Sequence, residues 1–264
     1  MLSGYKDLPL VIKEQISRVV EIWKRHMQDD LTGVYLHGSI CLDAFEPNSG
    51  DIDILVVVAR TLSVAERLVL AKEIIAIDGQ PCPLEMSAIT SAEAKNWKNP
   101  GNCVFHYSDF WTERYKKRFI NPQEEVYVVD HDFPDADVTS YIRLINQSGI
   151  VLYGQSIAET FAGVPDEDFW AAISSNIDDY DFNAYNERYF ASNILILGRI
   201  LSFKTEKRIL SKYEGGLWMA DHVPVHLKDI AEKALGVWYN EESHTFEPDR
   251  LQMLRDYLVA EIKK

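Results

Sequence analysis

The sequence predicts an α/β domain over residues 1–160, followed by an all-α domain over residues 161–264. Three observations support this division. Short apolar runs at 34–36, 54–58 and 83–90 alternate with segments of helical periodicity in the first part. The Ala-Gly-Val-Pro-Asp stretch at 162–166 then interrupts the pattern, and a mostly helical remainder follows. The chain of 264 residues is long enough for two hydrophobic cores.

The elements of the first part follow in a clear order. Apolar residues recur at helical spacing from Ile12 to Trp23, which predicts an amphipathic helix over 8–28. The 34–36 run predicts the first strand, and a second strand begins at Asp51. We expect a helix to open at 62–64, a strand over 83–90 and another helix over 105–119.

A Gly-Ser turn closes the first predicted strand. Gly38 and Ser39 follow the apolar run directly, so they lie where a strand turns into a helix. Backbone N–H groups and a hydroxyl at such a turn are suited to binding phosphate. A surface turn in which Ser39 only caps a helix is the simpler alternative.

Two aspartates begin the second strand. Because side chains alternate along a strand, Asp51 and Asp53 share one face while Ile52 and Ile54 point to the other. Two close carboxylates repel each other, and a divalent cation with oxygen ligands relieves that repulsion. The combination with the Gly-Ser turn therefore predicts a site for a nucleoside triphosphate and its metal.

The strand over 83–90 adds a third carboxylate. Glu85 stands among apolar residues, and a neighbouring strand could bring it beside the aspartate pair. In that position Glu85 is a candidate general base for an acceptor hydroxyl. An exposed glutamate on an edge strand is the alternative.

These residues resemble a known signature. Gly38-Ser39, Asp51-X-Asp53 and Glu85 are similar to the polymerase-β-like nucleotidyltransferase superfamily, and more narrowly to the aminoglycoside adenylyltransferases that act on streptomycin and spectinomycin. The resemblance implies a nucleotidyltransferase domain with a mixed sheet and a helical domain. It also implies that the three carboxylates bind two Mg²⁺ ions and that Glu85 is the base, with ATP as co-substrate.

The resemblance continues through most of the chain. Asp137 with 141–143, and then 149–154, is similar to the helix and strand that end the family's first domain. The segment 211–220 resembles the helical domain, and Lys212 stands where the family has a lysine that reaches the ATP phosphates. A solvated lysine at a helix start is the alternative.

The acceptor end is less similar. Trp111 is a candidate aromatic wall, and Asp179, Asp181 and Glu187 are candidate contacts for a cationic acceptor. Streptomycin-acting relatives have a tryptophan in this acidic region, whereas residues 178–188 contain none, which favours spectinomycin over streptomycin.

Composition is consistent with a small cationic substrate. The net charge of −14 disfavours nucleic acid as a partner, and the best basic run, at 116–118, is short. Three irregularly spaced cysteines indicate reduced thiols, and neither a signal sequence nor a membrane span is apparent. We expect a cytoplasmic monomer.

The sequence thus predicts Mg-dependent transfer of AMP from ATP to a hydroxyl of an aminoglycoside or aminocyclitol antibiotic, with release of pyrophosphate and resistance as the result. Two alternatives remain open. One is another acceptor, either a small molecule or a protein hydroxyl, and the other is a catalytically idle nucleotide-binding module.

Overall fold

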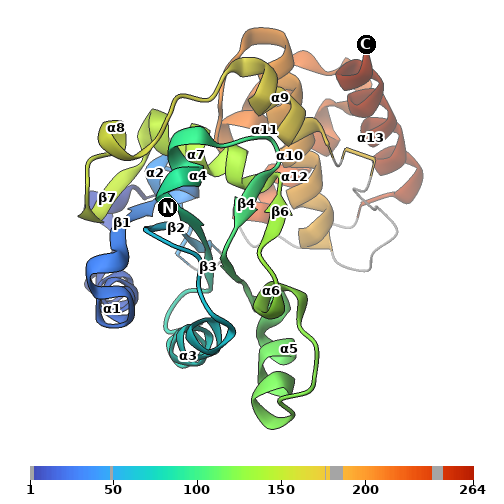
Figure 1. Ribbon diagram of the computed structural model, residues 1–264. Helices are drawn as coiled ribbons and strands as arrows, with labels where there is room; N and C mark the ends of the chain where they lie inside the picture. The colour runs from blue at the N-terminus through green and yellow to red at the C-terminus, as the bar shows by residue number, and fades with distance from the viewer. Residues whose placement is uncertain (1–2, 48–49, 176, 179–186, 240–245) are drawn as a thin grey trace. The chain divides into compact units, whose positions relative to one another are not determined.

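The chain folds into two compact units, residues 1–172 and residues 173–264, in a computed structural model (Figure 1). The structure describes residues 3–47, 50–175, 177–178, 187–239 and 246–264. Each unit has its own buried core. No helix in these described ranges is long and apolar enough to cross a membrane.

A five-stranded mixed sheet forms the centre of the first unit. Its order is β5-β3-β2-β1-β7, and only β2 and β3 are parallel among the neighbouring pairs. The strands are β1 (Leu31–Leu36), β2 (Ile52–Val58), β3 (Leu84–Thr90), β5 (Phe105–Tyr107) and β7 (Ile150–Gly154). A separate pair joins β4 (Gly101–Cys103) and β6 (Phe133–Asp135). The predicted α/β fold with a mixed sheet is confirmed.

Helices α1 (Leu10–Met27) and α3 (Val64–Ile75) lie side by side below the sheet in Figure 1. The apolar stripe of α1 is buried, and Trp23 packs edge-on against Phe105 of β5 with ring centroids 5.4 Å apart. Ser63 and Glu66 form a reciprocal capping box that starts α3 where the sequence predicted a helix. Both helices therefore cover one face of the sheet, and Asp53 and Glu85 lie on the opposite face, which also carries buried apolar side chains such as Leu55 and Val57.

Seven more helices belong wholly or mostly to the described part of the first unit, and all but α5 and α7 have fewer than ten residues. Of these, α2 and α7 are in contact with each other, and α2 also contacts β2. The bounds are α2 (Gly38–Cys41), α4 (Ser91–Asn96), α5 (Asp109–Ile120), α6 (Tyr127–Asp130), α7 (Asp137–Ser148), α8 (Ile157–Thr160) and α9 (Asp166–Ser174).

The predicted helix over 105–119 was wrong at its beginning. Residues Phe105–Tyr107 form β5, which pairs with β3, and the helix starts only at Asp109. Phe105 and Tyr107 are buried on one face while His106 points to the other, which is the alternation of a strand. Aromatic residues fit a half-buried edge strand well. Here that preference for a strand outweighed the helical spacing of the apolar residues on which the prediction rested.

The two compact units are divided after Ala172, whereas the domain boundary predicted from the sequence lies after residue 160. The intervening segment is attached to the first unit. Phe161 packs edge-on against Tyr35 of β1, with ring centroids 4.8 Å apart. Arg143 of α7 donates to the Val164 carbonyl and forms an ion pair with Asp166.

The described residues of the second unit form the helices α10 (Glu187–Glu206), α11 (Lys212–His222), α12 (Lys228–Tyr239) and α13 (Pro248–Lys263). Its first three helices pack closely because α11 has glycines at the contacts. A Cβ on Gly215 would lie 2.6 Å from Arg199 Cγ of α10, and one on Gly216 would lie 2.5 Å from a methyl carbon of Leu235 of α12. Larger side chains at these positions would force the helices apart.

Candidate active site

The predicted Gly-Ser turn joins β1 to α2. Gly38 has a φ of +69°, and a Cβ built there would lie only 1.9 Å from Asp53 Oδ2. The backbone N–H of His37 donates to the Asp53 carbonyl at 3.1 Å, which fixes the turn to β2. Glycine is therefore required by both the backbone angle and the neighbouring carboxylate. Ser39 follows on the first turn of α2 and is half-buried.

The sheet register brings together two of the three predicted carboxylates. Asp53 of β2 is the direct parallel partner of Glu85 of β3, so the two side chains leave the same face on adjacent strands. Asp51 lies just before β2 and is exposed, whereas Asp53 and Glu85 are half-buried. The strand placement predicted for Glu85 is confirmed by this pairing.

A tyrosine from α7 completes the surroundings of Glu85. The Tyr141 hydroxyl donates a hydrogen bond to Glu85 Oε1 at 3.1 Å. Burial raises the pKa of Glu85 to about 7, and the charges of Asp51, Asp137 and Asp135 act in the same direction, while the Tyr141 hydrogen bond opposes them. A carboxyl group with a pKa near neutrality is suited to exchange a proton with a hydroxyl.

Tyr141 also links Glu85 to the glycine turn. Its ring lies against the imidazole of His37, with ring centroids 4.6 Å apart and an interplanar angle of 31°. His37 is buried, and burial lowers its pKa to about 3, so the imidazole is neutral at physiological pH. The turn and the candidate base are therefore supported by one aromatic pair, which sequence reasoning did not assign to the site.

Two further acids face the same region. Asp135 ends β6 and Asp137 begins α7. The pKa of Asp137 is raised to about 6, first because surrounding protein desolvates it and then because Asp135 repels its charge, although Asp137 retains solvent access. The sequence indicated Asp137 only as part of a helix, and a place in the first turn of a helix gives no signal of proximity to Glu85.

The carboxylates fit magnesium as a ligand set. Asp51, Asp53 and Glu85 offer only oxygen atoms, and the charges of Asp51, Asp135 and Asp137 already disfavour the ionised form of Glu85. Within the described part of the chain, no three His, Cys, Asp or Glu side chains surround one point as metal ligands. Mg²⁺ commonly uses one or two carboxylates together with substrate phosphates and water. The arrangement is thus compatible with a metal that arrives with a nucleotide, and the two-ion site stays a prediction.

Lys212 is the first residue of α11 in the helical unit. Ser211 and Glu214 form a capping box that fixes the start of this helix. The Lys212 ammonium donates to Ser192 Oγ at 2.9 Å and lies 4.0 Å from the centre of the Trp238 ring. The predicted helix start is confirmed, while the role of Lys212 in phosphate binding stays a prediction.

The predicted acceptor contacts are less well defined. Trp111 lies on α5, where the Arg114 guanidinium carbon is 4.8 Å from its ring centre. Glu187 is half-buried at the start of α10. Asp179 and Asp181 lie outside the residues that the structure describes. Trp111 and Glu187 stay predictions as acceptor contacts.

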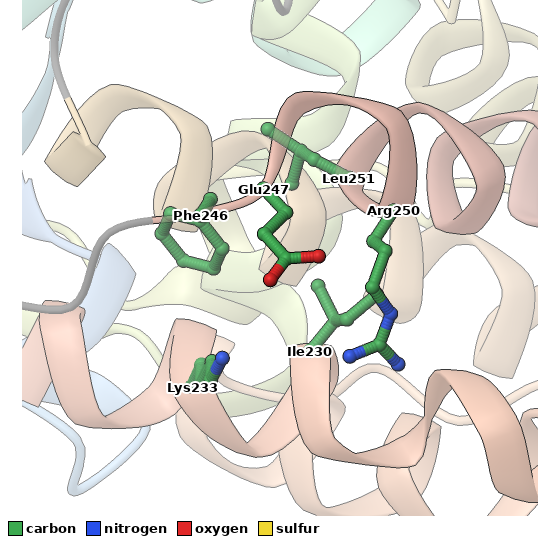
Figure 2. Close-up of a pocket in the computed structure, with 6 residues that line it drawn as sticks. All are labelled: Ile230, Lys233, Phe246, Glu247, Arg250 and Leu251. Atoms are coloured by element: carbon green, nitrogen blue, oxygen red, sulfur yellow. The ribbon is translucent and has the colours of Figure 1, made fainter.

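The helical unit also has a small pocket, shown in Figure 2. It is lined by Ile230, Lys233, Phe246, Glu247, Arg250 and Leu251. The Arg250 guanidinium is engaged by both carboxylate oxygens of Asp229 at 2.7 Å. The Arg250 guanidinium is the strongest anion-binding group that lines this pocket, and its bidentate ion pair with Asp229 already occupies it.

Substitution of Gly38 by alanine should reduce activity at least about a hundredfold, because the new methyl group would displace the Asp53 carboxylate and the positive φ would be strained. The turnover number of purified Gly38→Ala enzyme measures this effect. Gly79 provides a matched control, since it also has positive φ (+68°) but a methyl group added there would meet no atom within 4 Å. Equal losses for Gly38→Ala and Gly79→Ala would show that backbone strain alone is responsible.

The raised pKa of Glu85 should make stability depend on pH in metal-free protein. With a carboxyl pKa of 4.5 when unfolded and about 7 when folded, the protein is most stable below pH 4.5 and loses stability as pH rises through 7, because the buried carboxyl group must then ionise. Glu85→Gln should therefore raise the free energy of unfolding at pH 8 by about 1–3 kcal/mol and change it little at pH 5. Urea unfolding in a chelator at both pH values tests this, and an equal change at both would contradict it.

Comparison with known proteins agrees with this arrangement. A nucleotidyltransferase domain model matches residues 13–128, and a model of the aminoglycoside adenylyltransferase C-terminal domain matches residues 159–261. The spectinomycin 9-adenylyltransferase of Enterococcus faecalis is 25% identical over 258 residues, which span 95% of this chain and 96% of that protein. An aminoglycoside (3'') (9) adenylyltransferase of Klebsiella pneumoniae is 21% identical over 263 residues, with 96% and 95% covered.

The fold is also similar to a solved structure. The crystal structure of the Enterococcus spectinomycin adenyltransferase with ATP and spectinomycin superposes with a TM-score of 0.81 at 23% identity, and covers 96% of this chain and 99% of that one. The two domain models match successive parts of the chain, and the full-length relatives carry both parts in the same order. The chain therefore has a nucleotidyltransferase domain followed by a helical domain that matches the C-terminal domain of the aminoglycoside adenylyltransferases.

Proposed function

We propose that the protein transfers AMP from ATP to a hydroxyl of spectinomycin or a closely related aminocyclitol, and thereby confers resistance. The pairing of Asp53 with Glu85 beside the Gly38 turn is the observation that carries the proposal. This observation supports the proposal because Asp53, Glu85 and the Gly38 turn are close together, as the roles proposed for them as metal ligand, base and phosphate-binding turn require. The two domain matches support the choice of adenylyl transfer as the reaction.

Glu85 is the base in this proposal. In the metal-free protein, burial and the neighbouring carboxylates raise the pKa of Glu85, which favours proton uptake, and the Tyr141 hydrogen bond orients its carboxylate. The acceptor oxygen then forms a bond to the α-phosphorus of ATP. The bond from that phosphorus to the β-phosphate bridging oxygen breaks, and pyrophosphate leaves.

The other site residues are proposed to bind Mg²⁺, the triphosphate and the acceptor. Asp51, Asp53 and Glu85 would hold Mg²⁺, which supplies charge neutralisation for the phosphates when bound. Gly38 and Ser39 bind the triphosphate through the turn, and Lys212 contributes a cation from the helical domain. Trp111, Glu187 and the segment with Asp179 and Asp181 are proposed to contact the cationic acceptor. The net charge of −14 favours attraction of such a molecule.

Pyrophosphate release from ATP in the presence of Mg²⁺ tests the proposal, with spectinomycin, streptomycin and other aminoglycosides as acceptors. We expect release above the no-acceptor rate with spectinomycin, and a much lower rate with streptomycin because residues 178–188 contain no tryptophan. Mass analysis of the acceptor should show the addition of one AMP. Binding of ATP without release for any antibiotic would redirect the search to other hydroxyls or to a binding-only role.

A further inference from the structure

One half-buried carboxylate of the first unit is bonded to two strands of the sheet. Asp78 lies in the loop between α3 and β3. Its Oδ1 accepts a hydrogen bond from the backbone N–H of Leu84 at 2.8 Å, and its Oδ2 accepts one from the Tyr107 hydroxyl at 2.7 Å. Leu84 directly precedes Glu85 on β3, and Tyr107 ends the antiparallel neighbour β5. Asp78 therefore joins both strands at the end of the sheet where the candidate base lies.

The hydrogen bonds continue from β5 to α5. The Tyr107 hydroxyl lies 2.9 Å from Thr112 Oγ1, near the start of that helix. Burial raises the pKa of Tyr107 and the charge of Asp78 raises it further, while the Thr112 hydrogen bond opposes them, so the phenol keeps its proton. A phenol has one proton and a carboxylate only accepts, so Tyr107 donates to Asp78 and Thr112 donates to Tyr107. We call Asp78, Leu84, Tyr107 and Thr112 the Asp78 network.

The loop that carries Asp78 is held by α1. Gln15 of α1 is only 1% exposed, and its side chain is bonded to backbone groups on both sides of Asp78. Its Nε2 donates to the carbonyls of Ile77 at 3.0 Å and Cys82 at 2.7 Å, and its Oε1 accepts from the Cys82 N–H at 3.1 Å. The Asp78 N–H donates to the Ile74 carbonyl of α3 at 2.9 Å. The Asp78 carboxylate thus stands on a backbone fixed by two helices.

Trp111 is the neighbour of Thr112 on α5. Its backbone N–H donates to the Ser108 carbonyl at 3.0 Å, at the start of the helix. Its ring lies edge-on to Phe110, with ring centroids 5.4 Å apart, and 4.8 Å from the guanidinium carbon of Arg114. Both partners belong to α5, so the indole moves with this helix. Its distance from the sheet therefore depends on how the beginning of α5 is attached.

We infer that Asp78 is a positioning residue that sets the distance between the candidate base Glu85 and the aromatic side chain of Trp111. It is bonded to the residue before the base and, through Tyr107, to the residue after the tryptophan. An acceptor that meets both groups at once is held productively only when their distance is kept. The inference rests on the proposed function, in which Glu85 takes the acceptor proton and Trp111 contacts the acceptor. It goes beyond that function by assigning a role to the loop between α3 and β3.

Tyr107→Phe is the first variant of the test, because it removes the bridging hydroxyl and keeps the buried ring. It should raise the KM for the acceptor about three- to tenfold, while the KM for ATP stays within about twofold. Asp78→Ala should have a larger effect on the acceptor KM, since it also leaves the Leu84 N–H without its partner. Initial rates with ATP and acceptor varied separately measure both constants, with the antibiotic that gives the fastest pyrophosphate release as acceptor.

A double-mutant cycle with Trp111→Leu separates positioning from packing. Without the indole there is nothing for the network to position, so adding Tyr107→Phe should change the acceptor KM less than about twofold. Tyr35→Phe is the matched control. Tyr35 is also a fully buried tyrosine of the first unit, and its hydroxyl bonds to the Gln155 carbonyl and Thr160 Oγ1, after β7. This control should lower thermal stability as Tyr107→Phe does and leave the acceptor KM unchanged.

The outcomes separate the inference from the proposed function. If Tyr107→Phe leaves the acceptor KM unchanged, raises the KM for ATP equally, or has its full effect in Trp111→Leu protein, Asp78 does not act through Trp111 and the inference is overturned. An unchanged acceptor KM in Trp111→Leu alone also overturns it. In each of these cases AMP transfer by the wild-type protein still supports the proposed function. If the wild-type protein transfers AMP to none of the antibiotics, the proposed function fails and the inference fails with it.

Discussion

Asp53→Asn is expected to lower the turnover number about a hundred- to a thousandfold while the protein remains folded. Asp53 connects the candidate base to the glycine turn. It is the strand neighbour of Glu85 in the parallel β2–β3 pair, and its carboxylate fills the space that a side chain at Gly38 would need. Asparagine has nearly the same shape but no negative charge. The loss thus reports on the negative charge at this position, which is proposed to hold the Mg²⁺ that would neutralise the phosphates.

Steady-state rates at saturating ATP and acceptor, with thermal unfolding of the same samples, measure this effect. Asp29→Asn is a suitable control, because Asp29 is exposed and precedes β1 at the end opposite to the Gly38 turn. We expect wild-type rates for it. An Asp53→Asn enzyme with more than about a tenth of wild-type activity would contradict a central role for this carboxylate. A Mg²⁺ titration should also show a higher half-saturating concentration for Asp53→Asn.

The local part of this site was predictable from the sequence. The glycine turn after β1 and the aspartates at the start of β2 follow from apolar runs and turn chemistry, and the structure has both. The position of Glu85 beside Asp53 required one further step, since strand neighbours are set by pairing over long distances in the chain. An acidic residue within an apolar strand was enough to suggest it.

Side-chain contacts between distant segments were not predictable. Tyr141 meets Glu85 across 56 residues of sequence, and nothing about its place on a helix indicates a hydrogen bond to a strand. The contacts of Arg188 and Lys212 with the Trp238 ring were equally unpredictable, because helical periodicity shows which residues share a helix face but not which helices meet. The β5 strand was missed for a related reason: its three residues gain stability from pairing with β3.

Glu85→Gln should lower the turnover number about a hundred- to ten-thousandfold, which is the range for loss of a general base. Glutamine can still accept the Tyr141 hydrogen bond, so the local structure should persist while the ability to take a proton is lost. The KM for ATP should rise much less than the turnover number falls. This pattern distinguishes a base from a residue that only binds the nucleotide.

Two further variants separate the role of the proton from that of the geometry. Glu85→Asp keeps a carboxylate on a side chain that is shorter by one methylene group. It should therefore retain more activity than Glu85→Gln, although its carboxylate lies further from the acceptor hydroxyl than that of the wild-type enzyme. Tyr141→Phe removes the hydrogen bond to Oε1 and keeps the ring against His37, so it should lower activity less than Glu85→Gln. Rapid-quench measurement of AMP transfer in a single turnover would assign each loss to the chemical step. If Glu85→Gln matched the wild-type rate in that step, another group would have to accept the proton. Asp137 would be the next candidate, because its pKa is also raised, to about 6.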